Sequence, residues 1–409
     1  MKPQELNIFR WLRPDFVVVT TLLFTVVALI SLVSFNLTLF DPIEKALADF
    51  NFSDLLYSKL SSKQELLDTN IVLVNIGHLD REQIARQIKR IRSYHPKIIG
   101  FDGFFAVKRD PTVDSALQVQ LKDPPGLVMA CYLTGKDAVE GVYDSLETSA
   151  VYFNSGNKAL VNLGGANPET STVRFFSPVL SFNNKEFYAM AANLVSKYDR
   201  AAFKRLIARG NKREIIHYIG NRNAFISLDA TEVLDSLTDL SIIRNKIVLM
   251  GYMGESFGQP KDLEDIFYTP LNPELAGRSR PDMYGVIIHA NAASMILSGT
   301  YINVMPSWLQ IVLSFIFCYF YVLFFTWLSS RNPALFDLLF PAILLTINVL
   351  LVYTFFILYK SCSYSISATY FLVPVVLYKT FLTWYERTIV IISKKIKLPK
   401  LLFPPKAKS

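Results

Sequence analysis

Long apolar runs near both ends of the chain constrain its fold more than any other feature. Residues 16–40 form one such run, and residues 307–329, 334–359 and 364–383 form the others. Each is long enough to cross the ~30 Å hydrocarbon core of a bilayer as a helix rising ~1.5 Å per residue. We therefore predict four transmembrane helices, with a folded domain between them at residues 41–306.

Two of these runs have features that complicate the prediction. The first could be a cleaved signal peptide, because Ala46–Ala48 has the A-x-A form of a cleavage site. Its apolar part exceeds the usual ~7–15 residues, however, and charged residues separate it from that site. The last run contains Pro374 and Lys379, but proline is tolerated in membrane helices and a terminal lysine can reach the interface. We keep all four as spans.

The basic residues give the expected topology. The net charge is +8, and its excess lies in residues 1–15 and after residue 378, where eight Lys or Arg residues accompany Glu386 alone. Lys and Arg favour the cytoplasmic side, so residues 1–15 and the tail, 384–409, should be inside. The tail is either a stop-transfer flank or a segment along the inner leaflet.

This topology places the protein in the cytoplasmic (inner) membrane, in contact with its lipids, as a multi-pass protein. Residues 41–306 then lie outside the cytoplasm, in the periplasm of a Gram-negative cell. A nucleic-acid binder would carry its basic excess on the folded domain. The charges between the two ends sum to zero here, so we expect no nucleic-acid partner.

The outside domain alternates short strands with helices. NIVLVNIG (70–77), KIIGFD (97–102), LVMACYL (127–133) and KIVLMGY (246–252) are typical of buried strands, and residues 80–94 and 112–121 have helical spacing. This order predicts an α/β fold with a largely parallel sheet and flanking helices. Further expected strands are 159–164, 173–176 and 214–219, and further expected helices are 187–198 and 230–237.

The stretch GVIIHANAASMIL (285–297) precedes the second apolar run. It is too short to span a membrane, and its alanines and serine would let a helix approach a sheet closely. We predict that it is the last helix of the outside domain.

Three motifs in a fixed order carry a resemblance to a known family. They are KIVLMG at 246–251, DIFYTP at 265–270 and GVIIHA at 285–290, followed by an apolar run. Together they resemble the class 2 CHASE family (CHASE2), extracellular sensory domains named for their association with cyclases and histidine kinases. Asp102, Asp114 and Val173–Arg174 also match.

The resemblance covers roughly residues 41–380 and implies one span before the domain and about three after it. Two segments depart from the family pattern. Ser171–Thr172 stands where the family often has Asp-Gly, and HLDREQIARQIKR (78–90) stands where an aromatic-rich segment is common. Members commonly continue into an output enzyme, whereas for this chain we expect no fused output domain.

Asp102, Asp114, Asp265 and His289 are the predicted ligand-binding residues. Asp102 follows a buried strand, where ligands often bind parallel sheets, and the other three could converge on it. Such a set could respond to pH, hold a ligand or bind a metal. Alternatively all four are structural, with Asp114 starting a helix, Asp102 in a turn and His289 docking its helix.

No catalytic residue, metal or cofactor is assigned. The chain lacks a Gly-x-Ser-x-Gly elbow, a Cys/His pairing and a phosphate-loop ending after Gly251, so we expect no enzyme. The favoured function is a membrane sensor that signals through a protein partner or as a homo-oligomer. The alternative is a structural or assembly subunit of a cell-envelope complex.

Overall fold

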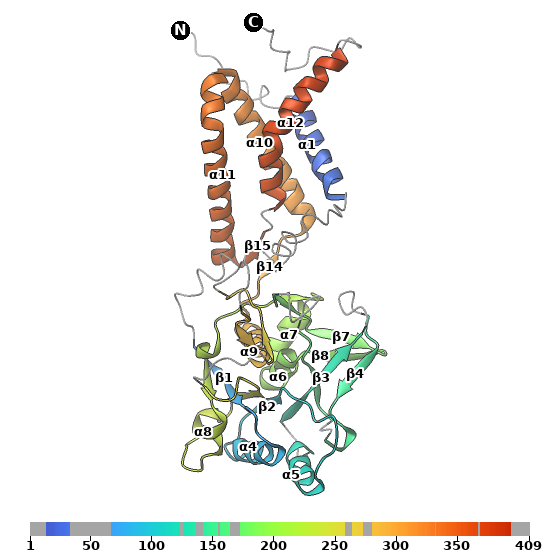
Figure 1. The fold of residues 1–409 in the computed structure, drawn as a ribbon, viewed down its shortest axis with the longest axis vertical. Helices are drawn as coiled ribbons and strands as arrows, with labels where there is room; N and C mark the ends of the chain where they lie inside the picture. Colours follow the sequence, from blue (N-terminus) through green and yellow to red (C-terminus); the bar gives the residue numbers. More distant parts are fainter. Residues whose placement is uncertain are drawn as a thin grey trace. The chain divides into compact units, whose positions relative to one another are not determined.

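The computed structural model describes residues 14–32, 67–122, 126–135, 142–153, 156–163, 172–257, 264–272, 280–331, 333–366 and 369–393. The chain divides into two compact units (Figure 1). One comprises Met1–Asp41 and Asn303–Ser409, and the other is Pro42–Ile302.

A seven-stranded, mostly parallel sheet forms the centre of the unit Pro42–Ile302. Its strand order is β10-β1-β11-β2-β3-β4, and β5 pairs with β3. Every pairing is parallel except that of β3 with β4. The predicted α/β fold with a largely parallel sheet is confirmed. The strands are β1 (Asp68–Asn75), β2 (Ile98–Phe101), β3 (Leu127–Thr134), β4 (Ser145–Thr148), β5 (Lys158–Leu160), β10 (Phe225–Leu228) and β11 (Ile247–Gly251).

Helices cover both faces of this sheet (Figure 1). Val72 and Val74 of β1 point to one face, where they share an apolar cluster with Ile88 of α4, Leu117 of α5 and Val233 of α8. Strand side chains alternate between faces, so the remaining apolar residues of β1 face the opposite layer of α6, α7 and α9. The helices are α4 (Arg81–Ser93), α5 (Pro111–Lys122), α6 (Met190–Tyr198), α7 (Arg200–Ala208), α8 (Ala230–Leu234) and α9 (Gly285–Ser298).

Helix α9 approaches the central strand β11 very closely. A Cβ atom built on Gly251 would lie 2.7 Å from the Cβ of Val286, so glycine is needed at the end of this strand. Every residue of α9 from Gly285 to Ile296 is buried. Asn291 accepts a hydrogen bond from the Ile219 amide at 2.8 Å and donates one to the Gly220 carbonyl at 3.0 Å. The predicted last helix of the domain is therefore confirmed.

Smaller elements surround the sheet, and several were missed by the sequence analysis. β7 (Val179–Phe182) and β8 (Lys185–Tyr188) form a hairpin. Its turn residues Asn183 and Asn184 both have positive φ, as two-residue hairpins require. Residues 187–188 thus belong to a strand, and the helix expected at 187–198 begins only at Met190. The other antiparallel pairs are β6 (Phe175–Phe176) with β9 (Glu214–Ile215) and β12 (Ile266–Phe267) with β13 (Met283–Tyr284).

Four helices make up most of the described part of the other unit. They are α1 (Pro14–Leu32), α10 (Ser307–Arg331), α11 (Pro333–Cys362) and α12 (Thr369–Ser393), and the strands β14 (Asn303–Val304) and β15 (Tyr364–Ser365) pair in parallel. Leu23 of α1, Phe325 of α10, Phe340 of α11 and Tyr378 of α12 belong to one apolar cluster. The four helices therefore share a common core.

Two helices, not the predicted four, are long and apolar enough to span a membrane in the part of the chain that the structure describes. They are Ser307–Ser329 and Ala334–Leu358. The apolar stretch found within α1 is the shorter Val17–Val27, and residues 33–40 of that predicted span lie outside the described residues. Helix α12 falls short because Lys379, Glu386 and Arg387 interrupt its apolar sequence.

Replacing Asn291 tests how α9 is fixed to the domain. Asn291→Ala would leave the half-buried Ile219 amide and Gly220 carbonyl without their partner, which costs about 1 kcal/mol. We expect this loss in thermal or chemical unfolding of the full chain in detergent. Ser294→Ala, at a buried polar residue of the same helix, is the matched control and should change stability little. Equal effects of the two substitutions would contradict this role for Asn291.

Candidate functional site

Asp102 and His289 meet at the carboxyl end of the parallel sheet. Asp102 directly follows β2, and its amide donates a hydrogen bond to the Met250 carbonyl at 2.8 Å. His289 lies in the second turn of α9, which places its Nε2 atom 3.9 Å from Oδ2 of Asp102. This separation exceeds a hydrogen bond. The His289 side chain is 6% exposed and that of Asp102 is 14% exposed.

Asp265 lies in the segment that leads into β12, where it is exposed to solvent but near enough to Asp102 for the charge of Asp102 to raise its pKa. Its backbone has φ +52, a left-handed conformation that Asp adopts more readily than most residues. The Gly285 amide donates to the Asp265 carbonyl at 3.1 Å. A Cβ atom on Gly285 would lie 3.2 Å from both carboxyl oxygens of Asp265. The carboxyl group is therefore packed against the first turn of α9.

Desolvation shifts the pKa of each of the three groups toward its neutral form, although Asp265 itself is exposed to solvent. Desolvation raises the pKa of Asp102 to about 7. It also raises the pKa of Asp265 to about 8, with further contributions from the negative charges of Asp102 and Glu264. Burial lowers the pKa of His289 to about 4. Among the described residues, no lysine or arginine forms an ion pair with either carboxyl group.

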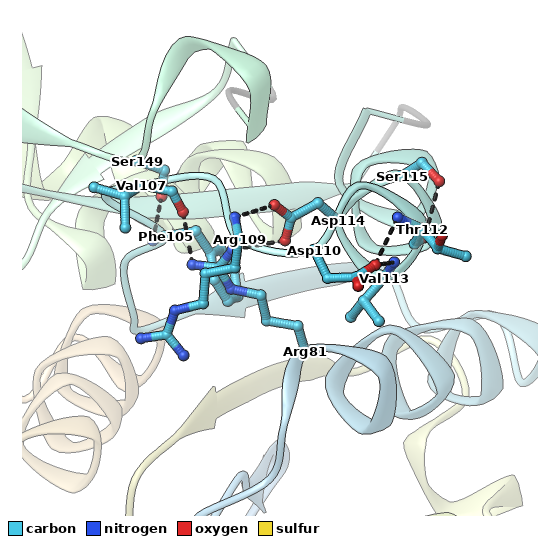
Figure 2. A network of polar contacts seen from close by, with 10 residues as sticks. All are labelled: Arg81, Phe105, Val107, Arg109, Asp110, Thr112, Val113, Asp114, Ser115 and Ser149. Atoms are coloured by element: carbon cyan, nitrogen blue, oxygen red, sulfur yellow. Dashed lines mark hydrogen bonds and ion pairs between the residues drawn. The ribbon is translucent and has the colours of Figure 1, made fainter.

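Asp114 does not join the other three predicted site residues. It lies in the first turn of α5, where it forms an ion pair with Arg81 at 2.6 Å and accepts a hydrogen bond from the Arg109 amide at 2.5 Å (Figure 2). Burial would raise the pKa of Asp114, but these two partners lower it below its ordinary value. The guanidinium of Arg81 also lies 5.2 Å from the centre of the Phe153 ring. Asp114 thus links α4 to the segment before α5, as the structural alternative proposed.

A second polar network at this sheet edge was not predicted. Asn75 at the end of β1 donates hydrogen bonds to Asp229 at 3.0 Å and to the Gly254 carbonyl at 2.9 Å. Asp229 in turn accepts from the Ser256 hydroxyl and the Phe257 amide. These hydrogen bonds fix the segment that follows β11. The sequence signal of this network is the Asp-x-x-Glu capping box of α8, formed by Asp229 and Glu232.

The chemistry available to Asp102, Asp265 and His289 is proton binding and hydrogen bonding. Within the described ranges, no group of three or more His, Cys, Asp or Glu side chains is placed to hold a metal ion. The carboxyl groups lack a compensating lysine or arginine among the described residues, so the neutral acid is more favoured for each than for an ordinary carboxyl group.

The CHASE2 domain family matches residues 21–325, which is about three quarters of the chain. No curated protein and no solved structure matches it. The chain therefore belongs to the CHASE2 domain family, which confirms the resemblance seen in its motifs.

The raised pKa values predict that stability depends on pH. The unfolded carboxyl groups titrate near 3.8, whereas the folded ones titrate near 7 and 8. The folded protein therefore binds more protons between these values, and this contribution to stability is lost as the pH rises to about 8. Asp102 contributes a slope of roughly 1.4 kcal/mol per pH unit between its two pKa values, and the exposed Asp265 contributes less because solvent screens its charge. His289 opposes this between about 4 and 6.5, because its folded pKa is the lower one.

Asp102→Asn should flatten the dependence of the unfolding temperature on pH between about 4 and 7, and Asp265→Asn should flatten it less, between about 4 and 8. The measurement is thermal unfolding of the full chain in detergent at several pH values. Glu186→Gln removes an exposed carboxyl group of β8 and should reproduce the wild-type curve. Parallel curves for the wild type and both Asn variants would exclude the raised pKa values.

Proposed function

We propose that this chain is a membrane-anchored sensor whose CHASE2 domain lies outside the cytoplasm and detects a small ligand or an envelope condition. The extent of the family match supports this most strongly, because residues 21–325 include parts of α1 and α10 as well as the whole α/β unit. Domains of this family are typically extracytoplasmic. Helix α9 ends at Ser298, and only residues 299–306 separate it from the membrane-length helix α10.

The ligand-binding site in this proposal is formed by Asp102, Asp265 and His289. Asp102 lies at the carboxyl end of the parallel strand β2, where ligands of α/β proteins commonly bind. His289 belongs to α9 itself, so a change at the site acts directly on the element that continues toward the membrane. Asp114 has no part in this site, because it is engaged with Arg81.

We further propose that α1 and α12 cross the membrane together with α10 and α11. Both contribute to the common apolar cluster, through Val19 and Leu23 of α1 and Val375 and Tyr378 of α12. The 19 residues of α1 extend about 28 Å, close to the hydrocarbon thickness.

The charge within α12 has a partner on α11. Lys379 Nζ lies 3.2 Å from Oδ1 of Asp337 and 5.0 Å from the centre of the Phe340 ring. Pairing reduces the cost of an ionised side chain in or near the hydrocarbon region. The ion pair therefore supports α12 as a span despite its lower apolarity. With four spans, both ends of the chain lie in the cytoplasm.

The signal then passes to a separate protein or to a second copy of the chain, and the protein itself is not an enzyme. Large apolar side chains on α10 are exposed within its unit and are available to lipid or to another helix. They include Trp308, Phe320, Phe324 and Trp327. The alternative is a structural subunit of an envelope complex. Such a subunit would remain in a stoichiometric complex at every pH and with every solute.

Cysteine labelling in intact cells tests this topology. Leu237 is 91% exposed on the α/β unit, and Ser329 lies near the end of α10. In a chain without its native cysteines, Leu237→Cys should react with a membrane-impermeant maleimide from outside. Ser329→Cys should react only after the cytoplasmic membrane is permeabilised. The reverse pattern would contradict the proposal.

A further inference from the structure

Basic side chains gather on the surface of helix α7 and the turn that follows it. Residues 197–214 contain seven Lys or Arg residues against two acidic ones, which leaves a net charge of +5. The charges of residues 16–378 as a whole sum to zero, so this excess is a local feature. The basic face, as we call it, consists of the exposed side chains of Arg200, Lys204, Arg205, Lys212 and Arg213.

The two acidic residues of this segment do not neutralise the basic face. Glu214 is buried, and its carboxylate forms an ion pair with the guanidinium of Arg209 at 2.6 Å. Asp199 caps α7, where its side chain accepts hydrogen bonds from two amides of the first turn. Neither Lys204 nor Lys212 forms an ion pair with another described residue. Their positive charge is therefore presented to the surroundings of the protein.

The exposed side of α7 combines this charge with an apolar side chain. Arg200, Lys204 and Ile207 are three or four residues apart, so they share one side of the helix, whereas Ala202 and Leu206 are buried. Ile207 is 42% exposed. Basic residues around an exposed aliphatic side chain are typical of helices that lie on a membrane surface.

Two contacts attach α7 to the end of α9 and to the residues after it. Arg205 donates a hydrogen bond to the Leu297 carbonyl at 3.4 Å. The guanidinium of Arg209 lies 4.4 Å from the centre of the Tyr301 ring, and Tyr301 is only 9% exposed. The basic face is therefore held beside the last residues of the unit Pro42–Ile302.

The chain limits how far these last residues can be from a membrane. The membrane-length helix Ser307–Ser329 begins six residues after Tyr301, and six residues span at most about 20 Å. Trp308, in the first turn of this helix, is 67% exposed, and tryptophan favours the membrane interface. A short linker gives the lipid head groups a high effective concentration near α7, so a weak attraction suffices for docking.

We propose that the basic face docks on anionic phospholipid head groups in the membrane leaflet that α10 enters from the α/β unit. Arginine and lysine side chains donate charge-assisted hydrogen bonds to phosphate oxygens, and Ile207 contacts the apolar edge of the head-group layer. This interaction goes beyond the proposed sensory function. It gives the end of α9 a second attachment to the membrane, through Arg205 and Tyr301, besides the linker to α10.

A fluorescent label on α7 of the full chain in lipid nanodiscs tests the proposal. Ala208 is exposed, so Ala208→Cys in a chain without its native cysteines can carry the label. Nitroxides attached to lipid head groups should quench it in discs of equal parts phosphatidylglycerol and phosphatidylcholine, and much less in discs of phosphatidylcholine alone. The quenching should be lost in about 1 M salt, where the Debye length falls to about 3 Å.

Neutralising the basic face should release α7 from the lipid. A basic residue near an anionic surface contributes roughly a fivefold factor to binding, so the double variant Lys204→Gln, Lys212→Gln should weaken docking about 25-fold. The matched control is the double variant Arg86→Gln, Lys89→Gln, which removes two exposed charges of α4 on the other face of the sheet (Figure 1). It should quench like the wild type.

Equal quenching in the two kinds of disc, or equal losses in the two double variants, would overturn the proposal. An acidic protein that copurifies with the wild type and is lost from the Lys204→Gln, Lys212→Gln variant would also overturn it, if phosphatidylglycerol has no effect on quenching. Both leaflets of a nanodisc have the same composition, so the result does not depend on the topology. If labelling of Leu237→Cys contradicts the topology while the quenching is as expected, the docking stands and the outside location does not.

Discussion

The close packing of α9 against the sheet is the contact on which the rest of the α/β unit depends. Gly251 ends the central strand β11 at a point where a methyl group would collide with Val286 of α9. This approach buries α9 along most of its length and lets Asn291 anchor the segment around Ile219. It also carries His289 to the end of β2. The position of the candidate site therefore follows from how closely the helix packs.

The same packing accounts for the electrostatics of the site. A carboxyl group in contact with water would titrate near its ordinary value, but here burial is the largest cause of the shift for Asp102, Asp265 and His289. At other points of this unit, buried carboxyl groups are matched by partners, as Asp114 is by Arg81 and Asp229 by Asn75. Asp102, by contrast, has no lysine or arginine paired with it among the described residues.

Much of the fold could be predicted from the sequence, because β-branched runs marked β1, β2, β3 and β11 and small residues marked α9. The short edge strand β10 and the helix α7 were missed, since neither has a distinctive apolar pattern. The proximity of Asp102 and His289 was anticipated from a strand end and a family motif. The separation of Asp114 was not, because the sequence does not reveal that Arg81 and the Arg109 amide reach it first. Apolar length alone predicted four spans, whereas two helices among the described residues are both long and apolar enough, since the charges of α12 lower its apolarity.

The central claim is that the protonation state of the site at Asp102 and His289 is transmitted to α9, the helix that continues toward the membrane. Hydrogen–deuterium exchange of the full chain in nanodiscs tests it most directly, with rates corrected for the intrinsic effect of pH. We predict faster corrected exchange in the first turns of α9 at about pH 9, where Asp102 beside His289 is ionised, than at about pH 6. This difference should be lost in the Asp102→Asn variant. Equal corrected exchange of α9 at both pH values in the wild type would contradict the account.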